Sequence, residues 1–198
     1  GLWVDYELQT SIKGLFALGE CNFSDHGANR LGASALMQGL SDGYFVIPYT
    51  MQNYLSDQIQ VPHIDTNAPE FDEAEKGVQA EIDRIYNIKG DESVDSIHKK
   101  LYHIMWDYVG MARNEAGLKK ALAMLKDIRK EFNEHVRIPG DKEGLNTELD
   151  KAIHLRDFIT MGELIAYDAL ERNESCGGHF REESQTEDGE AKRDDEHY

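Results

Sequence analysis

The residues best suited to chemistry lie close together near the start of the chain. Glu20 follows a short apolar run that ends at Gly19, and His26 and Arg30 stand in the polar segment after it. A carboxylate accepts hydrogen bonds from sugar-like hydroxyl groups, and the planar guanidinium of arginine binds a carboxylate through two parallel hydrogen bonds. These residue types therefore predict a site for a ligand that carries hydroxyl groups and a carboxylate.

Small residues open the helix that is expected after this polar segment. Ser34, Ala35 and Leu36 follow Gly32 and Ala33, so almost no side-chain bulk keeps a ligand away from the backbone. A helix N-terminus presents unpaired N–H groups and the positive end of the helix dipole. A ligand oxygen that gains negative charge during a reaction would be stabilised there.

Short strands and one helix are expected to position these groups. The unbroken apolar run 15–18 is typical of a strand covered on both faces, and open α/β sheets bind ligands at the carboxyl ends of such strands. Residues 2–8 alternate as a half-exposed strand does. A helix should run from Leu36 to Pro48, which is expected to stop or kink it, and helicity should resume over 51–55.

Two segments carry a resemblance to a known family. Glu20, followed by HGANRLG over 26–32, resembles the C-terminal part of the flavoprotein subunit of succinate dehydrogenase and fumarate reductase. The late segment SCGGHFREE, residues 175–183, is similar to that family's helical-domain signature in the form found in its type-B, Bacteroidetes-like members. Motif, order and separation agree, so the resemblance extends over most of the chain.

The resemblance implies FAD as the cofactor and a dicarboxylate, succinate or fumarate, as the substrate. Arg30 matches an arginine that binds one carboxylate of the substrate, and Glu20 matches a glutamate that contacts the ribityl or ribose hydroxyls of FAD. His26 either holds the substrate loop through backbone hydrogen bonds or touches the substrate, and the first role is preferred.

The resemblance also assigns the start of the expected helix to the flavin. Ala35 and Leu36 stand where the family usually has Ser-Leu, whose backbone N–H groups lie near the flavin O2, and Ser34 replaces a common Asn. A backbone contact tolerates these changes. No catalytic residue is expected in this chain, because the family's proton-donating arginine lies far upstream.

The implied function is that of an FAD-dependent oxidoreductase that interconverts succinate and fumarate by hydride transfer. Electrons would pass to an iron-sulfur subunit and through it to a membrane anchor with quinone, with the complex on the inner, cytoplasmic face of the cell membrane. The chain starts almost inside a strand and lacks the Gly-x-Gly-x-x-Gly fingerprint of dinucleotide binding. We therefore expect it to be a piece of a longer protein that lacks the FAD-anchoring half and is inactive alone.

Composition limits the other classes of partner. The formal charge of -17 and the pI near 4.8 argue against a nucleic-acid or anionic-membrane surface, which needs clustered Lys and Arg. No apolar run approaches the roughly 18 residues that span a bilayer. Cys21 and Cys176 are far apart in sequence and predict neither a disulfide framework nor a zinc site, and no metal site is expected.

The predicted fold class is mainly α, with an antiparallel helical bundle after a short α/β remnant of an FAD-binding domain. The expected boundaries are 1–57 for the remnant, 58–69 for a linker, 70–173 for the bundle, and 174–198 for a Gly-rich and acidic tail that is poorly ordered by composition. Helical spacing marks apolar inward positions, and capping residues precede the last three helices. The positions expected inside are Phe71, Ala74, Val78, Ile82, Ile85, Val94, Ile97, Leu101, Met105, Tyr108, Leu118, Leu122, Leu125, Ile128, Phe132, Leu149, Ile153, Leu164 and Leu170, and the expected caps are Asp91 or Ser93, Asn114 and Asn146.

Three other interpretations stay open. L-Aspartate oxidase has a similar His-Gly-Ala-Asn-Arg loop and also binds a dicarboxylate, although the segment 176–183 favours the respiratory enzyme. Residues beyond 69 could instead serve as a non-catalytic helical module that packs on the flavin domain or docks the iron-sulfur partner. An unrelated helical protein would leave the polar segment 26–30 unexplained.

Overall fold

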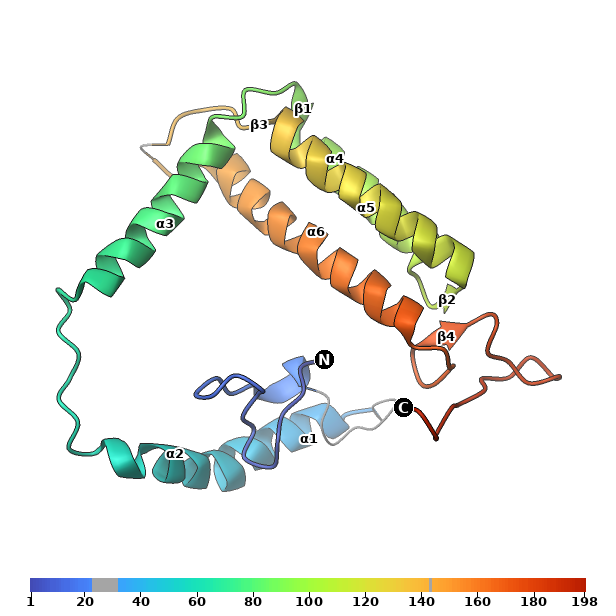
Figure 1. Cartoon of the computed structure of the whole chain (residues 1–198), viewed down its shortest axis with the longest axis horizontal. Helices are drawn as coiled ribbons and strands as arrows, with labels where there is room; N and C mark the ends of the chain where they lie inside the picture. Colours follow the sequence, from blue (N-terminus) through green and yellow to red (C-terminus); the bar gives the residue numbers. More distant parts are fainter. Residues whose placement is uncertain (23–31, 143) are drawn as a thin grey trace. The chain divides into compact units, whose positions relative to one another are not determined.

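The chain divides into two compact units, Gly1–Asp65 and Thr66–Tyr198 (Figure 1). The computed structural model describes residues 1–22, 32–142 and 144–198. The division falls within the expected linker 58–69, where Pro62 and Pro69 interrupt regular structure. Each unit is described by itself.

The first unit is a nearly continuous helix with a folded N-terminal segment against it. α1 (Ser34–Ser41) runs into the π-helical turn η2 (Asp42–Val46) and then into α2 (Ile47–Leu55), which ends in the 3-10 turn η3 (Ser56–Gln58). Pro48 lies in the first turn of α2, where a missing N–H costs little. The helix therefore continues past Pro48, and the break is the π-helical turn before it.

The N-terminal segment has single bridges where two strands were predicted. Leu2 pairs with Asn22 and Gln9 pairs with Phe16, and the 3-10 turn η1 (Gly19–Cys21) follows. An isolated pair of strands is marginally stable without further strands beside it, and in the described part of this unit these segments have only each other. The small core consists of Val4, Leu8 and Ala17, with Val46 and Ile47 packed on it.

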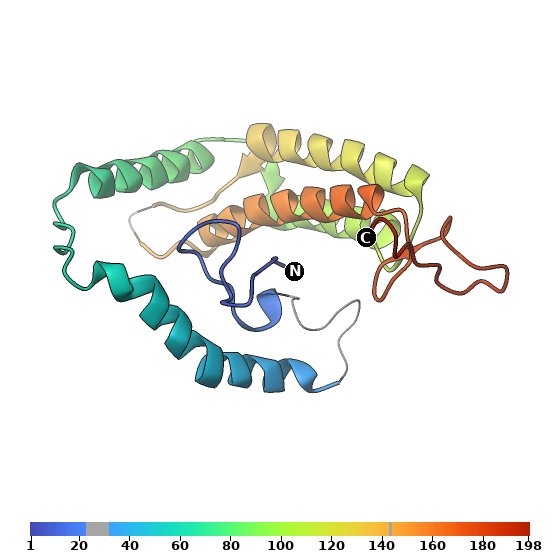
Figure 2. The same ribbon diagram turned by 60° about the horizontal axis from the view of Figure 1, so that its bottom comes forward.

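The second unit is an antiparallel bundle of three helices, joined by a fourth at one end (Figures 1 and 2). The bundle contains α4 (Val94–Tyr108), α5 (Glu115–His135) and α6 (Thr147–Glu171). α3 (Pro69–Tyr86) packs on α6. The mainly α fold class is confirmed.

The predicted capping residues begin the three bundle helices. Ser93 Oγ accepts from Ser96 N at α4, Asn114 Oδ1 accepts from Gly117 N at α5, and Asn146 Oδ1 accepts from Glu148 N and Leu149 N at α6. Each side chain satisfies an N–H group that has no partner within its own helix. The caps predicted at Ser93, Asn114 and Asn146 are confirmed, and Asp91 is not the cap.

The core of the second unit fills the space between the three bundle helices. Gly162 of α6 brings the helices close, because a Cβ there would lie 3.1 Å from Met105 Sδ and 3.6 Å from a Leu125 methyl group. The fully enclosed members of this core include Ile97, Leu118, Leu125, Phe132, Val136, Ala152, Leu155, Ile159 and Ala166.

Four of the predicted inward positions are wrong. Phe71 and Val78 of α3 are 52% and 62% exposed and Ala74 is exposed too, because α3 packs on the bundle near its C-terminal end, at Ile85, and its earlier turns face solvent. Leu164 of α6 is 57% exposed. The buried face of α6 contains alanine and glycine beside its leucine and isoleucine, so a pattern of large apolar residues does not reveal it.

Two short parallel strand pairs tie the ends of the bundle together. β1 (Glu92–Ser93) pairs with β3 (Val136–Arg137), and β2 (Ala112–Arg113) pairs with β4 (Phe180–Arg181). The second pair attaches the segment 174–198, which composition predicts to be poorly ordered, to the start of α5. No helix among the described residues is both long and apolar enough to cross a membrane.

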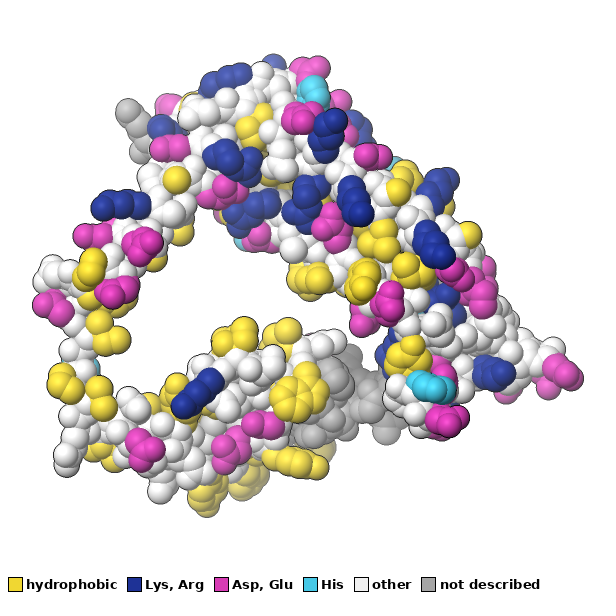
Figure 3. All heavy atoms as spheres, viewed as in Figure 1, with side chains coloured by type: hydrophobic (Ala, Val, Ile, Leu, Met, Phe, Trp, Pro, Cys, Tyr) yellow, Lys and Arg dark blue, Asp and Glu magenta, His cyan; other side chains and the backbone are white. Residues whose placement is uncertain are grey.

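Large apolar side chains are exposed on both units. In the first unit they include Trp3 and many residues of α1 and α2, and Figure 3 shows hydrophobic side chains gathered there. In the second unit Trp106 is 71% exposed and its ring stacks on Tyr102, with the ring centroids 5.9 Å apart. Acidic and basic side chains intermingle over the visible face of the bundle (Figure 3).

Candidate functional site

The predicted flavin and substrate residues belong to the first unit. Glu20 is exposed and lies in η1, the turn that follows the bridge at Phe16. His26 and Arg30 lie outside the described residues, so their roles stay predictions. The described part of the site therefore consists of η1 and the start of α1.

The start of α1 has the features expected of a backbone donor site. Ser34, Ala35 and Leu36 form its first turn, whose N–H groups have no partner within the helix. Ala33 stands at the N-cap with a positive φ of 65° and gives no side-chain cap, and a Cβ on Gly32 would meet nothing within 4 Å. Ala35 is buried, Ser34 half-buried and Leu36 exposed.

The structure brings η1 and α1 together. The two elements contact each other, and a Cβ on Gly39 of α1 would lie 3.9 Å from Gly19 Cα. Gly19 itself has a φ of 74°, a conformation that favours glycine. The two glycines therefore let the backbone beside Glu20 approach the helix that carries the predicted flavin-binding turn.

Three supporting residues were not predicted from the sequence. Asn22 is 2% exposed and donates Nδ2 to Ala17 O at 2.8 Å, which fixes the end of η1. Thr50 of α2 is 3% exposed and donates to Glu7 O at 3.0 Å, and Asn53 donates to the Glu7 carboxylate at 3.1 Å. The only sequence signal for this contact is that Thr50 and Asn53 lie one turn apart on α2. That spacing does not identify Glu7 as their partner.

The second resembling segment, residues 175–183, closes the C-terminal end of the bundle. Arg181 is 2% exposed and donates Nη1 to Ala169 O and Leu170 O, each at 3.0 Å. These carbonyls lie in the last turn of α6, where no further helical N–H reaches them. Ser175 bonds the backbone of Arg181 in both directions, donating Oγ to its carbonyl at 3.1 Å and accepting from its N–H at 2.8 Å. Arg181 therefore caps α6 from within the unit.

Two acidic residues of this segment hold the start of α5. Glu183 Oε1 accepts from Glu115 N at 2.6 Å, and Glu182 Oε2 accepts from Asn114 Nδ2 at 2.7 Å. Burial raises the pKa of Glu183, but the hydrogen bonds from backbone N–H groups and from Arg181 outweigh it and leave the pKa below its usual value. A carboxylate at a helix N-terminus is also favoured by the helix dipole.

His179 lies in a cationic environment within the same segment. Burial lowers the pKa of His179, and the charges of Arg113, Arg172 and Arg181 lower it further, against the opposing effect of its hydrogen bond to Arg172 O. These surroundings therefore favour the neutral form of the imidazole. These contacts give residues 175–183 a structural role within the unit.

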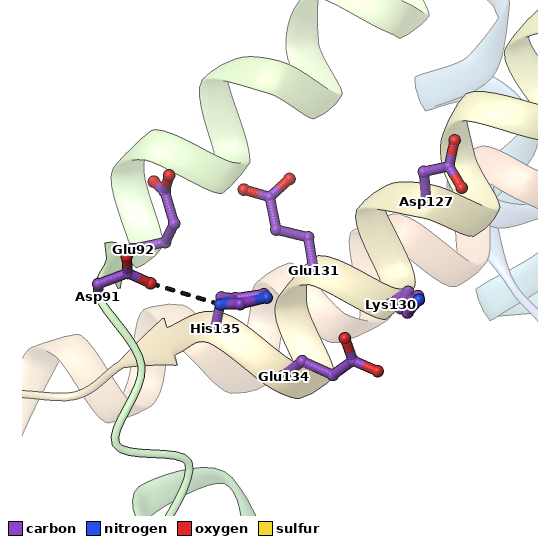
Figure 4. A pocket seen from close by; sticks show the side chains of 7 residues that line it. All are labelled: Asp91, Glu92, Asp127, Lys130, Glu131, Glu134 and His135. Carbon is purple, nitrogen blue, oxygen red and sulfur yellow. Dashed lines mark ion pairs between the residues drawn. The ribbon is translucent and has the colours of Figure 1, made fainter.

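The bundle carries open hollows that the sequence did not predict. One of about 440 Å³ is lined by Asp91, Glu92, Asp127, Lys130, Glu131, Glu134 and His135, and Figure 4 shows the ion pair between Asp91 and His135, 3.4 Å apart. Despite this acidity, no three His, Cys, Asp or Glu side chains among the described residues are arranged to hold a metal ion.

Comparison with known proteins connects both units to one family. The family described as "Fumarate reductase flavoprotein C-term" matches residues 98–198, just over half of the chain. The chain belongs to this family. The match begins within α4 and runs through residues 175–183, so the predicted family is confirmed, whereas its type-B form stays a prediction.

The similarity of this chain to its relatives extends over the first unit as well. An uncharacterized FAD-dependent oxidoreductase of Methanocaldococcus jannaschii is 32% identical over 92% of this chain, and a fumarate reductase flavoprotein subunit of Haemophilus influenzae is 30% identical over 91%. L-Aspartate oxidases of Acinetobacter baylyi and Yersinia pestis match at 29% and 28% identity. A solved quinol-fumarate reductase with menaquinol molecules matches all of this chain at 29% identity and a TM-score of 0.80.

The chain spans about a third of the length of the relatives it matches. It covers 31% and 29% of the first two proteins and 33% of the solved chain. The family membership and the helical fold are shown for these residues. The relatives themselves are about three times as long as this chain.

Proposed function

We propose that this chain contributes to a flavoprotein subunit that interconverts succinate and fumarate. The observation that carries the proposal is the contact of η1, which bears Glu20, with α1, whose first turn is Ser34 to Leu36, in a chain that belongs to the fumarate reductase flavoprotein family. In this proposal the Arg30 guanidinium binds one substrate carboxylate, and His26 supports the same loop.

The described residues fit FAD as the cofactor. The Glu20 carboxylate is exposed and suited to accept hydrogen bonds from ribityl or ribose hydroxyls, and the N–H groups of Ser34, Ala35 and Leu36 suit an electron-rich flavin edge. When bound, FAD supplies the hydride chemistry. The chain itself orients substrate through Arg30 and presents N–H donors where negative charge develops.

The need for Arg30 follows from the charge of the substrate. Succinate and fumarate carry two carboxylates, and a site shielded from water must pair each with a cation or with hydrogen-bond donors. Arginine offers a rigid fork that matches a carboxylate with two parallel bonds, whereas lysine offers one point charge. Arg30→Lys therefore keeps the positive charge and removes the pair of parallel hydrogen bonds.

The test is reduction of the intact flavoprotein by succinate without oxygen, followed as flavin bleaching in a single turnover. We expect Arg30→Lys to slow bleaching by about 100-fold or more while FAD stays bound, because misplacement of the substrate costs roughly this much. Arg137→Lys is the matched control, since Arg137 is exposed on β3 of the second unit. Bleaching at the wild-type rate in Arg30→Lys would remove Arg30 from the substrate site.

L-Aspartate oxidase activity is the second candidate, because L-aspartate oxidases are among the relatives. The same experiment with L-aspartate as the reductant separates the two, since both substrates are dicarboxylates but only one carries an amine. Bleaching by L-aspartate and not by succinate would replace the proposed activity. If the residues beyond 69 serve only to bind a partner, substitutions on the surface of the bundle should leave both reactions unchanged.

The proposed partners are an iron-sulfur subunit and, through it, a membrane anchor with quinone, on the inner, cytoplasmic face of the membrane. The relatives include fumarate reductase and succinate dehydrogenase flavoprotein subunits, and the solved neighbour is a quinol-fumarate reductase. Co-purification of an iron-sulfur protein with the intact flavoprotein tests this part of the proposal.

A further inference from the structure

A groove with an apolar floor runs between α4 and α5. Its volume is about 370 Å³, within the range of sites that take a drug-sized ligand or a large side chain. Ile104 of α4 and Met124 and Ile128 of α5 form the floor. Asp107 stands on the α4 side and Asp127 on the α5 side, so carboxylates border the floor from both helices.

Ion pairs flank one end of the groove, and a lysine that lies over a tyrosine ring flanks the other. At one end Lys100 Nζ pairs with Glu131 and, at 3.2 Å, with Glu92. At the other end Lys120 Nζ donates to Tyr108 Oη at 2.8 Å and lies 4.7 Å from the ring centroid. Lys100 and Lys120 are therefore already engaged with other groups.

Asp107 and Asp127 are the carboxylates of the groove that remain uncommitted. Their side chains form no ion pair or hydrogen bond with any other residue that the structure describes. The surface continues past Lys100 into the acidic hollow of Figure 4, where Asp127 also appears, together with Asp91 and Glu134. An apolar floor between unpaired carboxylates fits a cationic partner that also carries an apolar group.

We propose that the α4–α5 groove docks a basic amphipathic helix of a partner protein. One large apolar side chain of that helix would lie on Ile104, Met124 and Ile128, and lysine or arginine residues one turn away would pair with Asp107 and Asp127. The surface involves none of the residues assigned to flavin or substrate. A second copy of this chain is disfavoured as the occupant, because its net charge of -17 would meet an acidic rim.

The experiment uses the full chain and a fluorescein-labelled helical peptide with leucines on one face and lysines on the other. Binding is followed by fluorescence anisotropy, and the bound site is located by backbone amide shifts in NMR spectra. We expect Asp107→Asn with Asp127→Asn to weaken binding about tenfold or more, and Met124→Gln to weaken it about tenfold, with binding falling as salt rises. Circular dichroism confirms that each variant keeps its helices.

A matched variant separates docking from general attraction to an acidic protein. Glu73→Gln with Glu75→Gln removes the same charge from exposed positions of α3, and we expect it to change binding less than about twofold. The proposal would be overturned if the two double variants lost affinity equally, if Met124→Gln bound the peptide as the wild type does, or if the wild type did not bind it. Amide shifts that avoid α4 and α5 would overturn it too. Dimers that dissociate on groove substitution in sedimentation would also overturn it, in favour of a second copy.

Discussion

Gly90 lies directly against the backbone of His135 at the end of the bundle. A Cβ at this position would stand 1.9 Å from His135 O and 2.5 Å from His135 Cα, and Gly90 N donates to Val136 O at 3.3 Å. No side chain can yield here, because the neighbouring atoms are backbone. An alanine would therefore separate the segment before β1 from the end of α5.

We expect Gly90→Ala to lower the free energy of unfolding by about 1–3 kcal/mol, the typical cost of a substitution that forces the backbone to shift. Gly77→Ala is the control, because Gly77 is exposed in α3, a Cβ there would meet nothing within 4 Å, and alanine favours helix by ~1 kcal/mol. Urea unfolding followed by circular dichroism measures both. A cost below about 1 kcal/mol for Gly90→Ala would contradict the close contact.

Single residues also show how far sequence reasoning extends. The caps at Ser93, Asn114 and Asn146 could be predicted, because capping depends on a side chain and the next few N–H groups. The buried role of Arg181 could not, because the carbonyls of α6 that it bonds become neighbours only after the chain has folded. Composition counts Arg181 as one charge in an acidic tail and predicts disorder there.

At the scale of elements, α3 is joined to α6 by a cluster of charges. Glu81 of α3 pairs with Arg84 at 2.7 Å on its own helix and with Arg156 of α6 at 3.3 Å. The hydrogen bond from Arg84, helped by Arg156 and opposed by burial, lowers the pKa of Glu81 to about 2. The amphipathic pattern of α3 predicted a helix packed along its length, but it could not show that only the C-terminal end has a neighbour.

This shift predicts an acid-sensitive contact between α3 and α6. The pKa of Glu81 in the folded protein lies below its unfolded value of 4.5. The contribution of Glu81 to the free energy of unfolding is therefore complete above pH 4.5 and disappears as the pH falls toward 2. The contribution is about 1 kcal/mol once solvent screening is allowed for, since the side chain keeps 33% of its surface exposed. Glu81→Gln should lower the free energy of unfolding at pH 6 by this amount and leave it unchanged near pH 2.

Chemical unfolding across this pH range, with Glu75→Gln as the control on the same helix, measures the contribution of Glu81. Glu75 is exposed and forms no ion pair with another described residue. If the difference in the free energy of unfolding between wild type and Glu81→Gln stays constant from pH 6 to pH 2, the ion pairs do not stabilise the fold.

At the scale of the whole molecule, the two units differ in how much core they hold. The second unit buries a continuous core across α4, α5 and α6, whereas the described part of the first unit has a core of three buried residues and two that pack on them. Hydrophobic burial is the main term that offsets chain entropy. The first unit therefore has little stability of its own, and its exposed apolar helices need cover in the intact protein.

We expect residues 66–198 to fold alone with a thermal midpoint within a few degrees of the full chain, since the second unit holds its own core. Native-state hydrogen exchange of the full chain should find the slowest amides in α4, α5 and α6, and fast exchange through local opening in residues 1–65. Slow exchange in α1 and α2 comparable to that of the bundle would contradict this difference.

Both tryptophans of the chain are exposed, Trp3 by 59% and Trp106 by 71%. An indole already in water emits at long wavelength, so its emission changes little when the surrounding chain unfolds. Intrinsic tryptophan fluorescence should therefore be almost silent during folding of this protein, while ellipticity of its helices reports the full transition. A tryptophan introduced at Phe132, which is 1% exposed, would give the bundle an optical signal of its own.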